Sequence, residues 1–179
     1  MRGSRAASGH FAACALRDCG NDRVLKLYRA EGPPGWQSGL ARLHQEEVRA
    51  YQIAANDVVL RQHVPLSYGA EQVGQVFDVG GRDVGERYRL ELGIVFERLN
   101  GIPVKLQEFS ELPQHLVDYL NAFSAKGIYA DDGSVFGSQN AITCKFIDLT
   151  TSLGNRLAGE LIQQNAASPA ELEAWFNGE

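Results

Sequence analysis

The sequence is poor in the features that mark several classes of protein. It contains three cysteines, an odd number that builds no disulfide framework and, without a second cysteine pair or a histidine pair, no zinc site. No apolar run approaches the roughly 18 residues that cross a bilayer. Basic residues number 17 against 22 acidic ones, and a net charge of −5 argues against a surface that binds nucleic acid. These absences exclude a disulfide-rich secreted protein, a membrane protein and a nucleic-acid-packaging protein.

The residues that are abundant fit a folded protein. Apolar residues make up 44% of the chain and charged residues 22%, and a chain of this size buries roughly 70% of its unfolded surface without a disulfide or a metal. At roughly 150 residues per domain, we expect one domain or two small lobes that share a cleft. The apolar stretch at residues 10–16 is too short for a convincing secretory signal. We therefore expect synthesis in the cytoplasm, and export without a cleaved signal stays open.

Hydrophobic periodicity predicts an α+β protein in which strands come first and helices later. Ser38 is placed to cap the first helix and Asn56 to end it, while Ser110 and Gly127 bound the second. Asn100 and Gly101 mark a break between the two halves of the chain. The expected strands are residues 9–16, 23–28, 58–64, 72–79, 87–99 and 144–147. The expected helices are residues 38–55 and 111–126 and a final helical region after Asp148, near the end of which residues 168–176 form a short C-terminal helix.

One lysine lies where a charged side chain is costly. Lys26 is inside an apolar strand, so it must reach solvent or pair with an acid. Glu47 interrupts the apolar face of the next helix and favours Lys26 as its partner, whereas Glu46 points toward Arg42 and Arg49. The alternatives are a solvent-facing lysine and a glutamate at the edge of the helix surface. The residues expected on the helix face are Leu40, Leu43, Glu47, Ala50 and Ala54.

Several acids gather in the second half of the chain. Asp148 ends an apolar strand, where it can hold a metal at a cleft or cap the following turn. Asp131 and Asp132 follow the end of a helix and are either functional acids or part of a polar loop. Asn140 lies between these acids and Asp148.

Taken in order, these features resemble the protein-kinase-like fold. Residues 24–27 look like the strand that carries the family's lysine, and Glu47 looks like its helix partner. Residues 96–101 are similar to the hinge that receives adenine on backbone groups. Residues 127–132 look like the approach to the catalytic loop, and residues 145–149 resemble the strand that ends in the metal-binding aspartate.

The resemblance implies one bilobal domain that transfers a phosphoryl group from ATP, with Mg²⁺, to a protein hydroxyl. Residues 1–99 would form an N-lobe with an antiparallel sheet and one helix, and residues 100–179 a reduced helical C-lobe. Lys26, held by Glu47, would neutralise the phosphates. The other implied roles are phosphate binding at Ser8 and Gly9, adenine binding at Glu97 and Leu99, proton acceptance by Asp131 or Asp132, and metal binding by Asp148 with Asn140.

The chain departs from the family pattern at several positions. No His-Arg pair precedes the acidic loop, Thr150 stands where the family has glycine, and Gly3 and Gly9 form only a loose phosphate loop. Asn140 suits a metal site only if the loop carries a small insertion; otherwise residues 134–136 form a strand and Asn140 belongs to a hairpin turn. The short segment after the last strand is similar to that of the minimal kinases among bacterial type III secretion effectors, which modify host proteins without activation-loop phosphorylation.

Three further interpretations stay open. The chain could be a nucleotide-binding pseudokinase that serves as an interaction module, a small-molecule phosphotransferase, or an α+β binding domain without chemistry. We expect a monomer that acts on a protein, a host protein in the effector interpretation, and binds neither nucleic acid nor a membrane. No Ser-His-Asp spacing and no histidine pair supports a hydrolase or a zinc enzyme.

Overall fold

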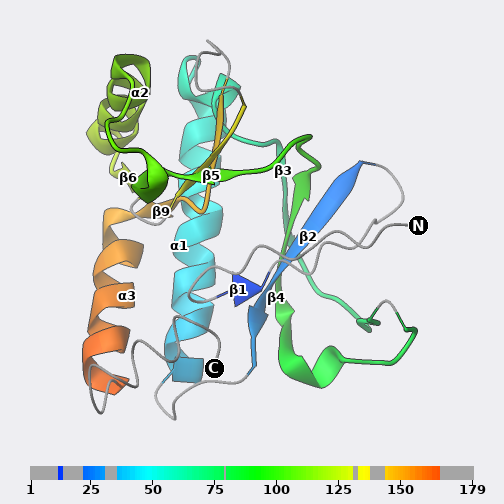
Figure 1. Ribbon diagram of the computed structural model, residues 1–179. Coiled ribbons are helices and arrows are strands. Elements are labelled where there is room, and N and C mark those ends of the chain that lie inside the picture. The colour runs from blue at the N-terminus through cyan, green and yellow to red at the C-terminus, as the bar shows by residue number, and fades with distance from the viewer. Residues whose placement is uncertain are drawn as a thin grey trace.

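A computed structural model describes residues 12–13, 22–30, 36–78, 80–130, 133–137 and 144–165. These residues form an α+β protein in which helix α1 lies between the largest sheet on one side and helix α3 on the other (Figure 1). None of the described helices is long and apolar enough to cross a bilayer. The α-helices are α1 (Trp36–Asn56), α2 (Gln114–Ala125) and α3 (Ser152–Asn165), and short 3₁₀ helices span Leu60–Gln62, Gly85–Arg87 and Leu106–Glu108.

The largest sheet is built entirely from the first half of the chain. Its strands are antiparallel and lie in the order β1-β2-β4-β3. The pairing of β2 with β4 shifts register between Leu27 and Tyr28, an irregularity of the kind that re-aims side chains. The strands are β1 (Ala12–Ala13), β2 (Arg23–Arg29), β3 (Ser67–Glu71) and β4 (Tyr88–Glu97).

The second half of the chain forms two small antiparallel sheets. One contains β5 (Val104–Lys105), β7 (Ser134–Phe136) and β8 (Lys145–Ile147) in the order β5-β7-β8. The other pairs β6 (Ile128–Tyr129) with β9 (Thr150–Thr151). Because β9 follows β8 after only two residues, the segment between these strands is fixed at both ends.

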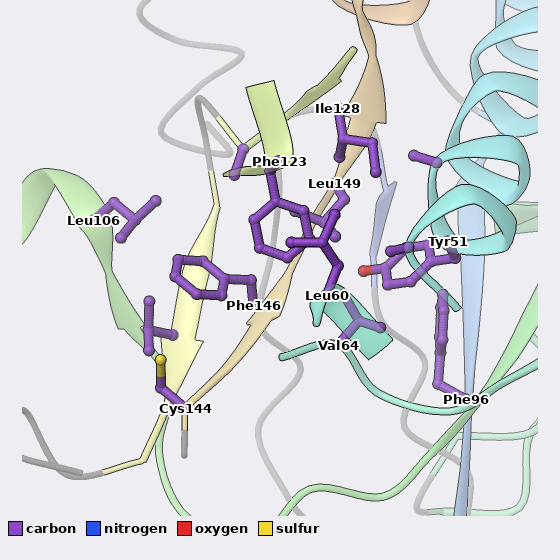
Figure 2. Packing of buried hydrophobic residues seen from close by; sticks show 14 of the residues in the cluster. Tyr51, Leu60, Val64, Phe96, Leu106, Phe123, Ile128, Cys144, Phe146 and Leu149 are labelled. Carbon is purple, nitrogen blue, oxygen red and sulfur yellow. The ribbon is translucent and has the colours of Figure 1, made fainter. Parts of the chain in front are cut away.

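The main hydrophobic core is shared by both halves. Phe123 of α2 and Phe146 of β8 pack edge to face with ring centroids 5.3 Å apart, and Tyr51 reaches in from α1 (Figure 2). Tyr51 also packs on Phe96 of β4 with ring centroids 4.6 Å apart. The core therefore holds α1 and the large sheet against the small sheets of the second half.

A second cluster covers the opposite face of the large sheet. Leu25 and Leu27 of β2 point away from α1 and pack with Val76 and Val84, which come from the connection between β3 and β4. This connection therefore acts as an apolar cover. Since Leu25 and Leu27 are on this face, the alternate residues Lys26 and Tyr28 face α1.

The expected positions of several elements are confirmed. The strand at 23–28 is β2, the helix at 38–55 is α1, the strand at 87–99 is β4 and the strand at 144–147 is β8, each within about three residues of the expected ends. Gly127 follows the C-cap residue of α2 and has a positive φ of 71°, as expected of a C′ glycine. The helix at 168–176 lies outside the described residues, and only Ala12–Ala13 of the strand at 9–16 is described.

Two expected strands are wrong and one helix start is misplaced. Residues 58–64 contain a 3₁₀ turn, because the carboxylate of Asp57 accepts hydrogen bonds from the backbone N–H groups of Val59 and Leu60, at 2.9 and 3.1 Å. In the segment expected as a strand at 72–79, Val73 and Val76 instead belong to the apolar cover, and Val79 lies outside the described residues. Helix α2 begins after Pro113 rather than at a Ser110 cap, since Leu116 N–H already bonds to the Pro113 carbonyl at 2.9 Å.

Gly93 tests the packing of the large sheet. A Cβ atom there would lie 2.5 Å from the carbonyl oxygen of Glu71 on β3 and 3.1 Å from Leu25 Cδ1. We expect Gly93→Ala to lower the free energy of unfolding by about 1–3 kcal/mol in urea denaturation, because β3 must move. The control is Gly74→Ala, where no atom lies within 4 Å of the added Cβ and the change should stay within about 0.5 kcal/mol. Equal stability of the two variants would contradict this packing.

Candidate functional site

Lys26 is the centre of a buried cluster of charges. Its Nζ donates to Glu47 Oε1 at 2.6 Å and to Asp148 Oδ1 at 2.9 Å. Lys26 is 9% exposed, and its two partners lie 21 and 122 residues away along the chain. The fold therefore joins β2, α1 and the segment after β8 at one ammonium group.

Glu47 reaches the cluster because its helix face is buried against the sheet. The neighbouring residues on that face, Leu40, Leu43, Ala50 and Ala54, are all buried, as the helical spacing predicts. Glu47 is 5% exposed, and its second oxygen, Oε2, accepts a hydrogen bond of 2.5 Å from the Tyr28 hydroxyl. Both carboxylate oxygens are thus bound by side chains of β2, and the predicted pairing with Lys26 is present.

Asp148 lies directly after β8 and has a left-handed backbone conformation, which is uncommon for residues other than glycine. Its φ is 61°, in the left-handed region that aspartate and asparagine tolerate better than most residues. The alternative role as a helix cap is filled by Thr151, whose Oγ1 accepts a hydrogen bond of 3.1 Å from Gly154 N–H. The unusual backbone instead turns the Asp148 carboxylate toward Lys26, and such conformations gather at functional sites.

The cluster carries more negative than positive charge. One ammonium faces two carboxylates, so their formal charges sum to −1. Asp148 is the outer member, with a side chain 31% exposed, and its Oδ2 has no hydrogen bond to a described residue. An oxygen of this kind is the ligand that a hard divalent cation prefers. Asp148 alone does not complete such a site: among the described residues, no group of three His, Cys, Asp or Glu could hold a metal ion.

Two buried tyrosines lie against the same charges. Burial is the largest cause that raises the pKa of Tyr28 and of Tyr51 well above 10.0, and the negative charge of Glu47 raises both further. Lys26 acts in the opposite direction for both. A backbone hydrogen bond with Leu149 also lowers the pKa of Tyr51.

The predicted adenine-binding residues are at the end of β4. The backbone N–H of Glu97 bonds to the Leu66 carbonyl at 2.9 Å, and the side chain of Glu97 is paired with Lys145 of β8. Leu99 is half-buried, and its backbone N–H donates to no described group. The structure therefore leaves Leu99, rather than Glu97, with a backbone donor for a ligand.

The remaining predicted site residues lie outside the described part of the chain. They are Ser8, Gly9, Asp131, Asp132 and Asn140. Residues Ser134–Phe136 do form a strand, β7, which pairs with β8. Asn140 itself lies outside the described residues, so its metal-binding role stays a prediction.

Sequence reasoning missed two contacts of the cluster. Tyr28 could have been found from its spacing, because it is two residues from Lys26 and strand residues two apart share a face. Glu46 was expected near Arg42 and Arg49, but its carboxylate accepts a hydrogen bond from the Thr151 hydroxyl of β9. No local signal could have found that pair, since the two residues are 105 positions apart.

No protein-family model, curated protein or solved structure matches this chain. Lys26, Glu47 and Asp148, which β2, α1 and the end of β8 bring together, are therefore the residues from which a function can be inferred.

The raised tyrosine pKa values predict a loss of stability at alkaline pH. In the unfolded chain a tyrosine ionises near pH 10.0, whereas Tyr28 and Tyr51 stay neutral there when folded. The folded state therefore binds more protons, so this stabilisation is complete below pH 10.0 and is lost as the pH rises further. Urea denaturation at pH values on both sides of 10.0 should show the decrease. In Tyr28→Phe this loss of stability with pH should be smaller. The same loss in this variant as in the wild type would contradict the raised pKa of Tyr28.

Proposed function

We propose that this protein is a phosphotransferase with a protein-kinase-like fold that moves a phosphoryl group from ATP to a protein hydroxyl. The observation that carries the proposal is the position of Lys26 between the helix carboxylate of Glu47 and the strand-end carboxylate of Asp148. A lysine fixed by an acid, beside a second acid with a partly exposed oxygen, suits a triphosphate and its cation.

The order of the elements supports the proposal. An antiparallel sheet and one helix come first, the chain then passes through residues 98–101 after β4, and helix α2 and the small sheets follow. Within the described ranges, strands before residue 99 pair only with one another, as do strands after residue 100. This division of the strand pairing supports the two-lobed arrangement that the sequence resemblance implies, although one core is shared by both halves.

Lys26 would bind the phosphates of the nucleotide, and Glu47 would hold its ammonium in place. Because Lys26 is buried, its charge is screened less than a surface charge would be. Asp148 would contribute the ligand for Mg²⁺, which when bound supplies charge neutralisation at the phosphates. The turned backbone at Asp148 fixes where that carboxylate points.

The residues on either side of the candidate bases Asp131 and Asp132 lie close in space to the strand that ends at Asp148. Asp131 and Asp132 are bracketed by Ala130 and Gly133, and the backbone N–H of Gly133 bonds to the Ala130 carbonyl at 2.9 Å. A Cβ atom on Gly133 would lie 3.2 Å from the carbonyl oxygen of Ile147, the residue before Asp148. This closeness supports Asp131 or Asp132 as the group that orients the acceptor hydroxyl and takes its proton.

The first test is nucleotide binding. We expect Mg·ATP to raise the melting temperature of the wild-type protein, because a ligand that binds only the folded state stabilises it. Asp148→Asn should lose this shift, since asparagine tolerates the left-handed backbone but lacks the charge. The matched control is Asp118→Asn on exposed α2 surface, which should keep the shift. No shift in the wild type would leave a binding domain without nucleotide chemistry and would overturn the proposal.

The second test is phosphoryl transfer. Lys26→Met should reduce transfer from ATP to a protein acceptor by at least about a hundredfold, because the phosphates lose their fixed cation. The control Lys105→Met removes an exposed lysine of β5 and should leave the rate unchanged. Binding of Mg·ATP with no transfer by the wild type would identify a pseudokinase. Full turnover by Lys26→Met would exclude the role of Lys26.

A further inference from the structure

We propose that Tyr28 is a positioning residue that sets the orientation of Glu47, and through it of Lys26; the inference rests on the proposed function. Tyr28 belongs to β2, two residues after Lys26, and is 3% exposed. Its hydroxyl has a charged partner, the carboxylate of Glu47. The ring packs edge-on to His44, with ring centroids 5.9 Å apart, so the phenol itself is held in place.

The two oxygens of Glu47 are divided between two donors. Oε1 accepts from Lys26 at 2.6 Å and Oε2 accepts from Tyr28 at 2.5 Å. When both oxygens of a carboxylate accept hydrogen bonds, the carboxylate cannot turn out of its plane about the Cγ–Cδ bond without weakening one of them. Each of these bonds is strengthened by the charge of the carboxylate. The hydroxyl of Tyr28 therefore fixes the plane of the Glu47 carboxylate, with its other oxygen directed at Lys26.

The helix that carries Glu47 is fixed independently on its other side. Glu46 is hydrogen-bonded by Thr151, and a Cβ atom on Gly154 would lie 2.8 Å from Glu46 Cβ. A Cβ atom on Gly39 would lie 2.3 Å from Leu161 Cδ1. Since α1 is packed this closely on β9 and α3, the freedom that remains at Glu47 is that of its side chain.

Loss of the Tyr28 hydroxyl would therefore act on the geometry of Lys26 and not on its charge. Lys26 would keep Asp148 as a partner, and an ammonium drawn toward Asp148 is displaced from the phosphates and competes for the carboxylate that the cation needs. We expect the transfer step to suffer more than the binding of the nucleotide.

The test compares Tyr28→Phe with Tyr51→Phe. Tyr51 is a matched control because it is also buried and also feels the charge of Glu47, but its hydroxyl makes no hydrogen bond to Glu47 or to another described side chain. In Tyr28→Phe, kcat should fall roughly tenfold or more, as expected for a hydrogen bond to a charged group, while KM for Mg·ATP changes less than about threefold. Tyr51→Phe should keep kcat within about threefold of wild type. Equal losses in both variants, or an unchanged kcat in Tyr28→Phe, would overturn the proposal.

A second measurement separates this inference from the proposed function. The buried hydrogen bond between Tyr28 and Glu47 should slow exchange of the hydroxyl proton with water, so that the wild type shows a resolved resonance that disappears in Tyr28→Phe, is weakened in Glu47→Gln and persists in Tyr51→Phe. If the wild type transfers no phosphoryl group but shows this pattern, the proposed reaction fails and the positioning contact stands. If transfer is present and the resonance is absent from the wild type, the role of Tyr28 is wrong.

Discussion

A buried ammonium between two carboxylates constrains the whole arrangement. Taking these charges out of water costs several kcal/mol per ion, and close pairing and hydrogen bonding offset that cost. Lys26 can be paired with both carboxylates only if β2, α1 and the end of β8 meet at one point. Tyr28 donates the hydrogen bond to the second oxygen of Glu47. The packing of α1 on the large sheet, on β9 and on α3 supplies that meeting point. Hydrophobic burial and charge pairing therefore specify the same geometry, and the site is assembled by the fold itself.

The site was partly predictable because some of its signals are local. Lys26 in an apolar strand and Glu47 in an apolar helix face are anomalies that periodicity reveals, and each needs a partner whatever the fold. Asp148 was recognisable as an acid at the end of an apolar strand. Its backbone conformation was not, because φ there depends on the contacts of the surrounding strands. Tyr28 was overlooked because a tyrosine in a strand ordinarily reads as core, and only the position of Glu47 gives its hydroxyl a role.

The errors in the predicted fold have the same physical origin. Val73 and Val76 lie inside the segment expected as a strand at 72–79, but together with Val84 they pack as a cover on a sheet made elsewhere in the chain. The true edge strand, β3, contains Ser67 and Gly69 and carries little alternation to detect. At residues 58–64, one carboxylate, that of Asp57, redirects the backbone into a turn. In each case a tertiary contact or a single side chain outweighs the local pattern.

The shared aromatic core limits how the two halves can move. Tyr51 and Phe96 come from the first half and Phe123 and Phe146 from the second, and all four belong to one cluster. Separating the halves would expose that cluster to water, so they are expected to melt in one cooperative transition. A large movement of the two halves about the link at Gly101, where φ is 108°, would therefore break this core. Under the proposed function, Mg·ATP would have to reach Lys26 without a large separation of the two halves.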